Sequence, residues 1–110
     1  MPETAMKKSK KRKLEPRGWK VGTAAEFLGL TPEEAALVEI KLALADSLRA
    51  LRKRQGRTQH DVAEILGSSQ SRVAKMEAAD ASVSLDLLVR ALLALGASAK
   101  DVARAVSRAA

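Results

Sequence analysis

Residues 59–76 read Gln59-His-Asp-Val-Ala-Glu-Ile-Leu-Gly-Ser-Ser-Gln-Ser-Arg-Val-Ala-Lys-Met76, and they decide the fold of this chain of 110 residues. The spacing of Ala63, Gly67 and Val73 predicts two short helices crossed by a tight turn. Ala63 lies where only a small side chain lets the helices approach. Gly67 can take the positive φ that a short turn demands. Val73 would fill the gap between the helices, so the stretch predicts a helix-turn-helix.

Two glutamines stand outside this frame, at places where a side chain would meet DNA. Gln59 opens the first helix and Gln70 opens the second, the position from which side chains point at base edges in a major groove. Polar side chains at the exposed start of a helix add nothing to a core, whereas they suit hydrogen bonding to bases. A helix-turn-helix that touches no DNA is the alternative, and the glutamines favour DNA binding over it.

The candidate DNA-binding side chains differ in the contact that each would make. Gln70 is the best candidate for adenine readout, because its amide has both a donor and an acceptor. Ser71 could reach a base or a phosphate, and Arg72 could bond guanine with two hydrogen bonds or pair only with a phosphate. Lys75, one turn further along, would contact a phosphate. The whole candidate set is Gln59, Ser69, Gln70, Ser71, Arg72, Lys75 and Arg57.

From about residue 41 to residue 96 the chain resembles the Xre family, the Cro and phage-repressor type of helix-turn-helix regulator. The likeness includes both glutamines, the small-glycine-aliphatic frame and Met76-Glu77 at the close of the second helix. It implies a lambda-repressor-like domain of five helices in which Gln59 supports the adenine-reading glutamine and binds a phosphate. The alternative for Gln59 is a simple helix-start residue. Glu77 is expected to cap the helix or to pair locally.

The segment before that region looks like the HigA-type antitoxins within the same family. The similar text is Gly18-Trp-Lys-Val-Gly-Thr-Ala-Ala-Glu-Phe-Leu-Gly-Leu30 followed by Glu33-Glu-Ala-Ala-Leu-Val-Glu-Ile40. This resemblance implies a second role, in which the protein neutralises a RelE/HigB-like ribonuclease toxin and represses the shared operon. Residues 21–48 carry five acids and one base, the right sign of charge to meet a basic toxin.

Composition excludes several other classes of protein. Without cysteine there are no disulfides, thiolate metal sites or cysteine nucleophiles, which fits a reducing cytoplasm. A single histidine, His60, argues against a metal cluster, and Trp19 and Phe27 are too few aromatics for the stacking platforms of RNA and single-strand binders. No paired carboxylates with a nucleophile and no Gly-rich phosphate loop stand at a workable spacing. We therefore expect neither an enzyme nor a bound cofactor.

The positive charge of the chain lies in two places. The net charge is +7, and residues 1–20 hold eight Lys or Arg against two Glu. Residues 49–75 hold seven bases and two acids, and this stretch coincides with the helix-turn-helix, where phosphate contacts would be needed. Residues 1–17 lack apolar periodicity and are expected to form a disordered basic arm that attracts phosphates. A nuclear import signal and a merely solvated end are the alternatives for that arm.

Capping patterns predict an all-α chain. A hydroxyl followed three residues later by an acid marks a helix start, as in Thr31 with Glu34 before a long helix that would end at Gln55. Other starts are expected at Thr23, Thr58, Ser69, Ser84 and Ser98. No alternating apolar pattern argues for a strand. The expected organisation is the arm, a short helical extension over residues 18–40 and a compact five-helix domain over 41–110. No apolar stretch is long enough for a signal peptide core or a membrane span, so a cytoplasmic protein is expected.

An apolar stripe of Leu37, Ile40, Leu44, Leu48 and Leu51 runs along the long helix. The second half of the stripe, Leu44 to Leu51, is expected to lie in the core. Its first half, Leu37, Val38 and Ile40, is expected to meet Trp19–Leu30 or a second chain.

Specific DNA binding predicts a homodimer, because one recognition helix covers too few base pairs and an inverted-repeat operator supplies two half-sites. The candidate dimer surface consists of Leu88, Leu92, Leu95, Val102 and Val106. The predicted function is a sequence-specific transcriptional repressor that is the antitoxin of a type II toxin–antitoxin pair. A stand-alone Xre-type or phage-type repressor without a toxin and a protein-bridging coactivator are the alternatives.

Overall fold

A computed structural model describes residues 28–109 of the chain. The expectations for the basic arm, for the helix start at Thr23 and for Trp19 and Phe27 lie outside the described residues. The chain divides into two compact units, residues 1–37 and residues 38–110.

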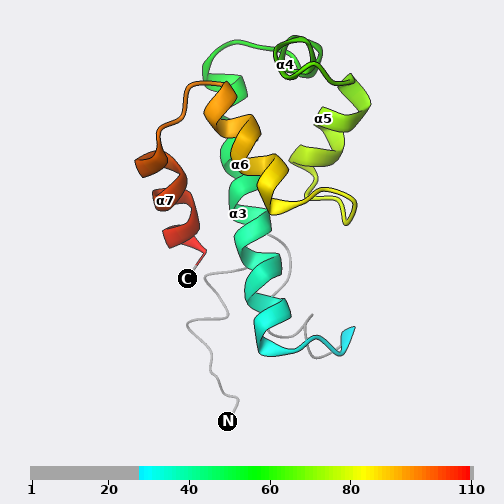
Figure 1. The fold of residues 1–110 in the computed structure, drawn as a ribbon, viewed down its shortest axis with the longest axis vertical. Helices are drawn as coiled ribbons and strands as arrows, with labels where there is room; N and C mark the ends of the chain where they lie inside the picture. Colours follow the sequence, from blue (N-terminus) through cyan, green and yellow to red (C-terminus); the bar gives the residue numbers. More distant parts are fainter. Residues whose placement is uncertain (1–27, 110) are drawn as a thin grey trace. The chain divides into compact units, whose positions relative to one another are not determined.

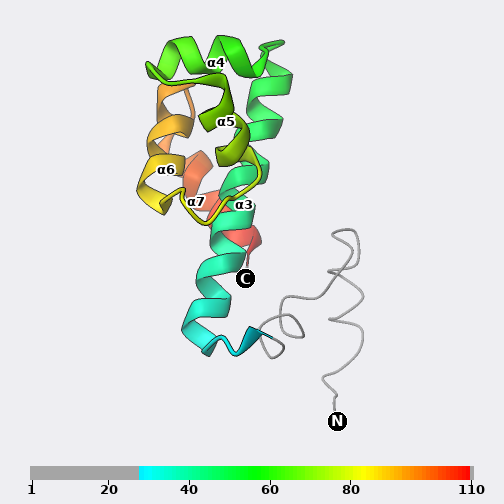
Figure 2. The same ribbon diagram turned by 90° about the vertical axis from the view of Figure 1, so that its right-hand side faces the viewer.

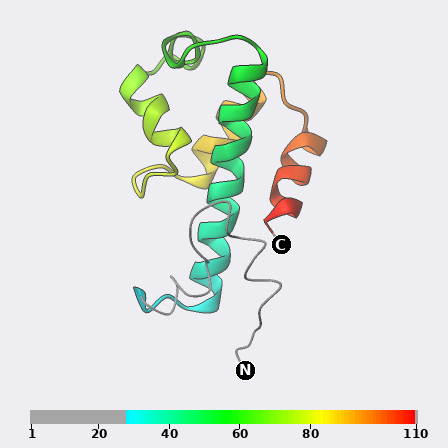
Figure 3. The same ribbon diagram turned by 180° about the vertical axis from the view of Figure 1, so that it is seen from behind.

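The described residues form helices and no strand, which confirms the all-α, five-helix prediction (Figure 1). The helices, labelled as in Figure 1, are α3 (Pro32–Arg54), α4 (Gln59–Leu66), α5 (Gln70–Glu77), α6 (Leu85–Ala94) and α7 (Ala99–Arg108). Helix α5 and helix α7 lie on opposite sides of the carboxy-terminal part of α3 (Figures 1 and 3). The recognition helix and the last helix therefore face different surroundings.

The predicted hydroxyl caps start the helices. At α4 the Thr58 hydroxyl accepts a hydrogen bond from the backbone N–H of Asp61 at 3.0 Å, and the Asp61 carboxylate accepts one from the N–H of Thr58 at 2.9 Å. These bonds satisfy donors that the first helical turn leaves without a partner. A hydroxyl oxygen accepts in the same way at Thr31, Ser69, Ser84 and Ser98. Helix α3 ends at Arg54, one residue before the predicted Gln55.

The turn between α4 and α5 has the geometry that the Ala-Gly-Val frame predicts. Gly67 adopts a left-handed conformation, with φ of 64°, and ends α4. The backbone N–H of Ser68 then bonds the carbonyl of Ala63 at 2.8 Å, a Schellman closure that reverses the chain. Ala63 and Val73 are both buried where the two helices cross. The helix-turn-helix prediction is confirmed.

All five helices contribute to one apolar core. Leu44 and Leu48 of α3 are buried with Val62 of α4, Met76 of α5 and Leu88 of α6. Ile40 is half buried against this core of its own chain, and the expected contact of this part of α3 with residues 19–27 lies outside the described residues. Leu37 is half exposed.

Three of the five candidate dimer residues are also core residues. Leu88, Leu92 and Leu95 are 0%, 3% and 4% exposed within the single chain. They fill the space beneath α6 and cannot reach a second chain, which corrects the sequence prediction for them. Val102 is half buried against the core, and Val106 is 36% exposed.

Candidate DNA-binding surface

Helix α5 presents its first turn to the outside of the domain. Helix α4 crosses above it in Figure 2, and the turn through Gly67 joins the two. Gln70, Ser71, Arg72 and Lys75 are all exposed. The structure thus brings these four predicted residues together on one short helix with Ser69 as its cap, and Gln59 lies beside them.

A chain of side-chain hydrogen bonds sets the orientation of both glutamines. The Gln59 amide donates through Nε2 to Glu77 Oε1 at 3.1 Å, and Gln70 donates through Nε2 to Gln59 Oε1 at 2.6 Å. An ionised carboxylate can only accept, so Gln59 must turn its NH₂ group toward Glu77 and its oxygen toward Gln70. Gln70 must then donate. Its own oxygen and its second N–H remain for a ligand, and this donor-acceptor pair matches the N7 and N6 groups of adenine.

Arg52 anchors this chain from α3. Its Nε donates to Glu77 Oε2 at 2.5 Å and its Nη2 to Glu77 Oε1 at 3.0 Å, while Nη1 donates to the backbone carbonyl of Arg57 at 3.0 Å. The Arg52 and Glu77 side chains are 12% and 5% exposed. A forked guanidinium on a carboxylate fixes direction as well as distance. The ion pair with its Gln59 bond therefore locks α3, α4 and α5 together.

Burial and hydrogen bonding oppose each other at Glu77. Burial by itself raises the pKa of this carboxyl, but the hydrogen bonds from Arg52 and Gln59 outweigh it and leave the pKa below its ordinary value. The same hydrogen bond raises the pKa of Arg52. Glu77 is thus ionised at neutral pH, and that charge sets the direction of the glutamine chain.

Sequence reasoning missed this arrangement. Glu77 was expected to cap its helix or pair locally, yet its partner Arg52 lies 25 positions earlier in the chain. Arg52 was counted only as part of the basic stretch. The sequence does contain one signal. Glu77 is the only acid of helix α5, whose other charged residues are basic, and such an acid could pair with a cation from another helix.

The remaining basic residues of the surface are available to phosphates. Within residues 28–109 no ion pair involves Arg57, Arg72 or Lys75. Arg57 donates only to the neutral Gln55 side chain, at 2.9 Å. The Ser69 oxygen accepts from the backbone N–H of Arg72 at 3.1 Å as a helix cap, which leaves its hydroxyl hydrogen to donate. Asp61 and Asp80 act on Arg57 and Lys75 only through space, so cations on and beside helix α5 remain able to bind a DNA backbone.

The described part of the chain offers neither a cluster of potential metal ligands nor a membrane-spanning helix. It contains no group of three His, Cys, Asp or Glu side chains that could hold a metal ion. Among its helices, none combines the length and apolar character that crossing a bilayer requires.

Comparison with known proteins gives one match. The model of the helix-turn-helix family matches residues 48–102, half of the chain, and covers the end of α3 through the first residues of α7. The chain therefore belongs to the helix-turn-helix family of Xre (Cro/C1) type, whose members are DNA-binding transcriptional regulators and not enzymes. No curated protein and no solved structure matches it.

Proposed function

We propose that this regulator is a sequence-specific repressor that reads an inverted-repeat operator as a homodimer. The observation that carries the proposal is the hydrogen-bond chain from Arg52 through Glu77 and Gln59 to Gln70. A buried ion pair at one end of this chain orients an exposed amide at the other. A binding group held in one geometry loses little conformational entropy when it meets its ligand. The ion pair itself stabilises the fold, but the orientation of the exposed Gln70 amide adds nothing to the core and suits base readout.

The other side chains of α5 divide between bases and backbone. Arg72 is exposed in the first turn, within reach of guanine or of a phosphate. Ser71 serves either. Lys75 and Arg57 form no ion pair in the described residues and serve phosphates, as does the free hydroxyl hydrogen of Ser69. Gln59 keeps one N–H beyond its bonds to Glu77 and Gln70, which suits the phosphate contact that the family resemblance implies.

A homodimer in this proposal uses the outer face of α7. Val106 is exposed there, among alanines that permit close helix packing, while Val102 one turn earlier packs against the core of its own chain. Two recognition helices would then meet half-sites about 10 base pairs apart, centre to centre. Selection of bound duplexes from a random pool tests this arrangement. Recovery of a two-fold symmetric site supports it, whereas a single asymmetric half-site contradicts it.

A second role as an antitoxin rests on the resemblance to HigA-type antitoxins and on the unit of residues 1–37. There Leu28 is 65% exposed and Leu37 is 49% exposed, and Glu33 and Glu34 form an acidic first turn of α3. Exposed apolar side chains beside acids suit a basic protein partner such as a RelE/HigB-like toxin.

Pull-down of the full-length protein from its own host tests the antitoxin role. The expected result is a small basic partner whose association is slowed when Glu33 and Glu34 are changed to Lys, because charges at an interface rim act on the association rate. Asp86→Lys, on the exposed face of α6, is the matched control and should leave the rate unchanged. If no such partner is captured, the stand-alone repressor is the better account.

Residues 1–17 are proposed to act as a basic arm that adds affinity for DNA of any sequence. Their Lys and Arg residues attract phosphates without needing a fixed geometry. The arm and the helix-turn-helix domain over residues 41–110 are proposed to bind the same DNA.

A further inference from the structure

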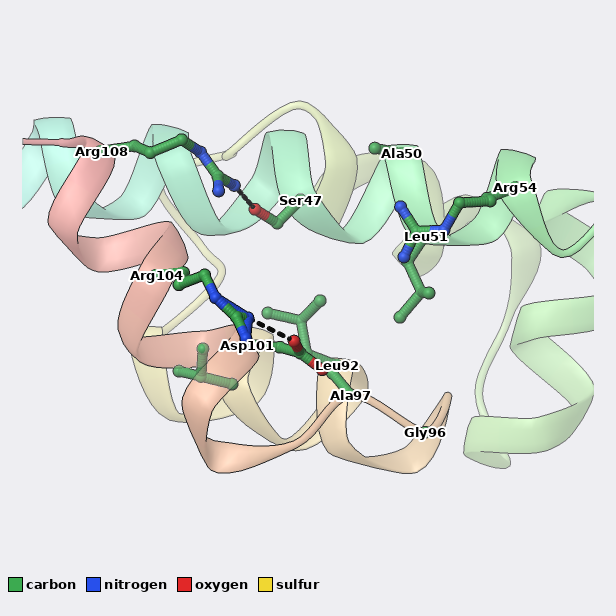
Figure 4. A pocket seen from close by; sticks show the side chains of 11 residues that line it. Ser47, Ala50, Leu51, Arg54, Leu92, Gly96, Ala97, Asp101, Arg104 and Arg108 are labelled. Carbon is green, nitrogen blue, oxygen red and sulfur yellow. Dashed lines mark hydrogen bonds and ion pairs between the residues drawn. The ribbon is translucent and has the colours of Figure 1, made fainter.

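Helices α3 and α7 flank a cavity of about 310 Å³ that is partly open to solvent, in the unit of residues 38–110 (Figure 4). That volume is at the small end of the range for small-molecule sites, roughly 300 to 1,000 Å³. Leu51 of α3, Leu92 of α6 and Val102 of α7 give the lining its apolar part. The cavity can therefore hold a small molecule with a hydrocarbon portion.

Three arginines line the same cavity. Figure 4 shows Arg104 and Arg108 reaching from α7, and Arg54 reaching from the last turn of α3. Arginine is the side chain best shaped to bind carboxylate or phosphate, because its planar fork makes two parallel hydrogen bonds. These guanidinium groups come from two different helices and surround one space. None of them belongs to the candidate DNA-binding surface.

The positive charge of this lining is only partly compensated. Arg104 pairs with Asp101, with NH1 and Oδ1 3.0 Å apart. Arg108 donates to the neutral hydroxyl of Ser47 at 2.8 Å. Arg54 makes no ion pair or hydrogen bond with any residue of 28–109. Asp101 also interacts electrostatically with Arg54, so three arginines share one acid and the lining keeps a surplus of two positive charges.

The cavity is separate from the recognition helix. It lies on the side of α3 that faces α7, whereas α5 lies on the other side (Figures 1 and 3). A duplex held by Gln70 and Lys75 would not fill it. The matching ligand is small, carries two negative charges and has an apolar part.

We propose that this cavity binds a small organic dianion, with a phosphate monoester or dicarboxylate bridging Arg54 of α3 and Arg108 of α7. Arg108 to Ser47 is the one side-chain hydrogen bond from α7 to α3 in the described residues. A bridging dianion adds charge-assisted bonds from both helices and fastens α7 to the domain. Because the ligand binds the folded state, it also raises the melting temperature.

Nuclear magnetic resonance titration of the ¹⁵N-labelled full-length protein tests this site without DNA. The probes are inorganic phosphate and succinate, each compared with sodium chloride at equal ionic strength. The expected result is saturable shifts of the backbone amides of Gly96, Ala97 and Asp101, which line the cavity. Phosphate alone producing them identifies the phosphate class, and succinate alone identifies the dicarboxylate class. Shifts confined to α5, or no saturable shifts with either probe, overturn the proposal.

Matched variants test whether the ligand binds in this cavity or is attracted only by the overall positive charge of the protein. Arg54→Gln and Arg108→Gln should each weaken binding at least about tenfold, because each removes a charge-assisted hydrogen bond. Lys100→Gln is the control. It removes the same charge from an exposed position of α7 outside the cavity, and it should change the affinity less than about twofold. Equal losses in all three variants would overturn the proposal. Arg54 makes no hydrogen bond or ion pair in the described residues, so its variant remains informative if Arg108→Gln loosens α7.

Discussion

Replacement of Arg52 by methionine should expose how much the domain depends on its ion pair. The change removes two hydrogen bonds to Glu77 and one to the Arg57 carbonyl, and leaves a carboxylate that is 5% exposed with only the more distant charge of Arg49 to offset it. Removing one partner of a buried ion pair costs about 3 to 5 kcal/mol. Glu77 retains its hydrogen bond from Gln59, and Arg52 is slightly exposed. We therefore expect the lower end, a loss of about 3 kcal/mol in the free energy of unfolding.

Urea unfolding followed by circular dichroism at pH 7 measures this loss. The control is Arg90→Met, because Arg90 pairs with Asp86 on the surface, where both side chains are about three-quarters exposed. Such a pair contributes about 0 to 1 kcal/mol. The double variant Arg52→Met/Glu77→Leu should recover most of the stability, since an apolar pair of similar volume is often as stable as a buried ion pair. An Arg52→Met variant no less stable than the control would refute the role of the pair.

The pH dependence gives an independent check with a definite sign. Burial opposes but does not overcome the hydrogen bonds from Arg52 and Gln59, so the folded-state pKa of Glu77 is below its unfolded value of about 4.3. Its contribution to stability is therefore present above that value and is lost as the pH falls through the folded-state pKa. Without Arg52, burial acts with less opposition and the carboxylate destabilises the fold until it is protonated. The loss caused by Arg52→Met should accordingly be smaller at pH 4 than at pH 7.

Three further substitutions or deletions address the turn, the dimer and the arm. Gly67→Ala should cost about 1 kcal/mol in urea unfolding, from the left-handed backbone alone, because an added Cβ meets no atom within 4 Å; no loss would show that the turn relaxes. Val106→Asp should give monomers in light scattering and abolish tight operator binding, whereas a variant that stays dimeric moves the interface away from α7. Deletion of residues 1–17 should weaken binding to all DNA and flatten its salt dependence by roughly 0.9 log unit for each phosphate that the arm no longer neutralises, and an unchanged slope would assign the arm another task.

Local features were predictable from the sequence because their causes are local. The hydroxyl caps, the positive φ of Gly67 and the small side chain of Ala63 each depend on a few neighbouring residues. The five helices and the helix-turn-helix follow from those features. The position of each helix along the chain could thus be predicted from the sequence alone.

Features that join distant residues were not predictable in the same way. An apolar stripe shows that Leu88 and Leu92 are buried but not whether their own chain or a second one buries them. A basic run likewise gives no sign that Arg52 turns inward to Glu77 while Arg54, two residues later, lines a cavity. Only the packing of α3 against α5 and α7 separates these roles.

Base readout by Gln70 can be measured by fluorescence anisotropy at one fixed salt concentration. A duplex selected from random DNA and its scrambled counterpart are each titrated with the wild-type protein, with Gln70→Ala and with the surface control Arg90→Ala. Gln70→Ala should lose about 1 to 3 kcal/mol on the selected duplex, with relaxed preference at one position per half-site, and far less on the scrambled one. Its thermal stability should hardly change, because the side chain is exposed. Equal losses on the two duplexes would contradict base readout by this helix.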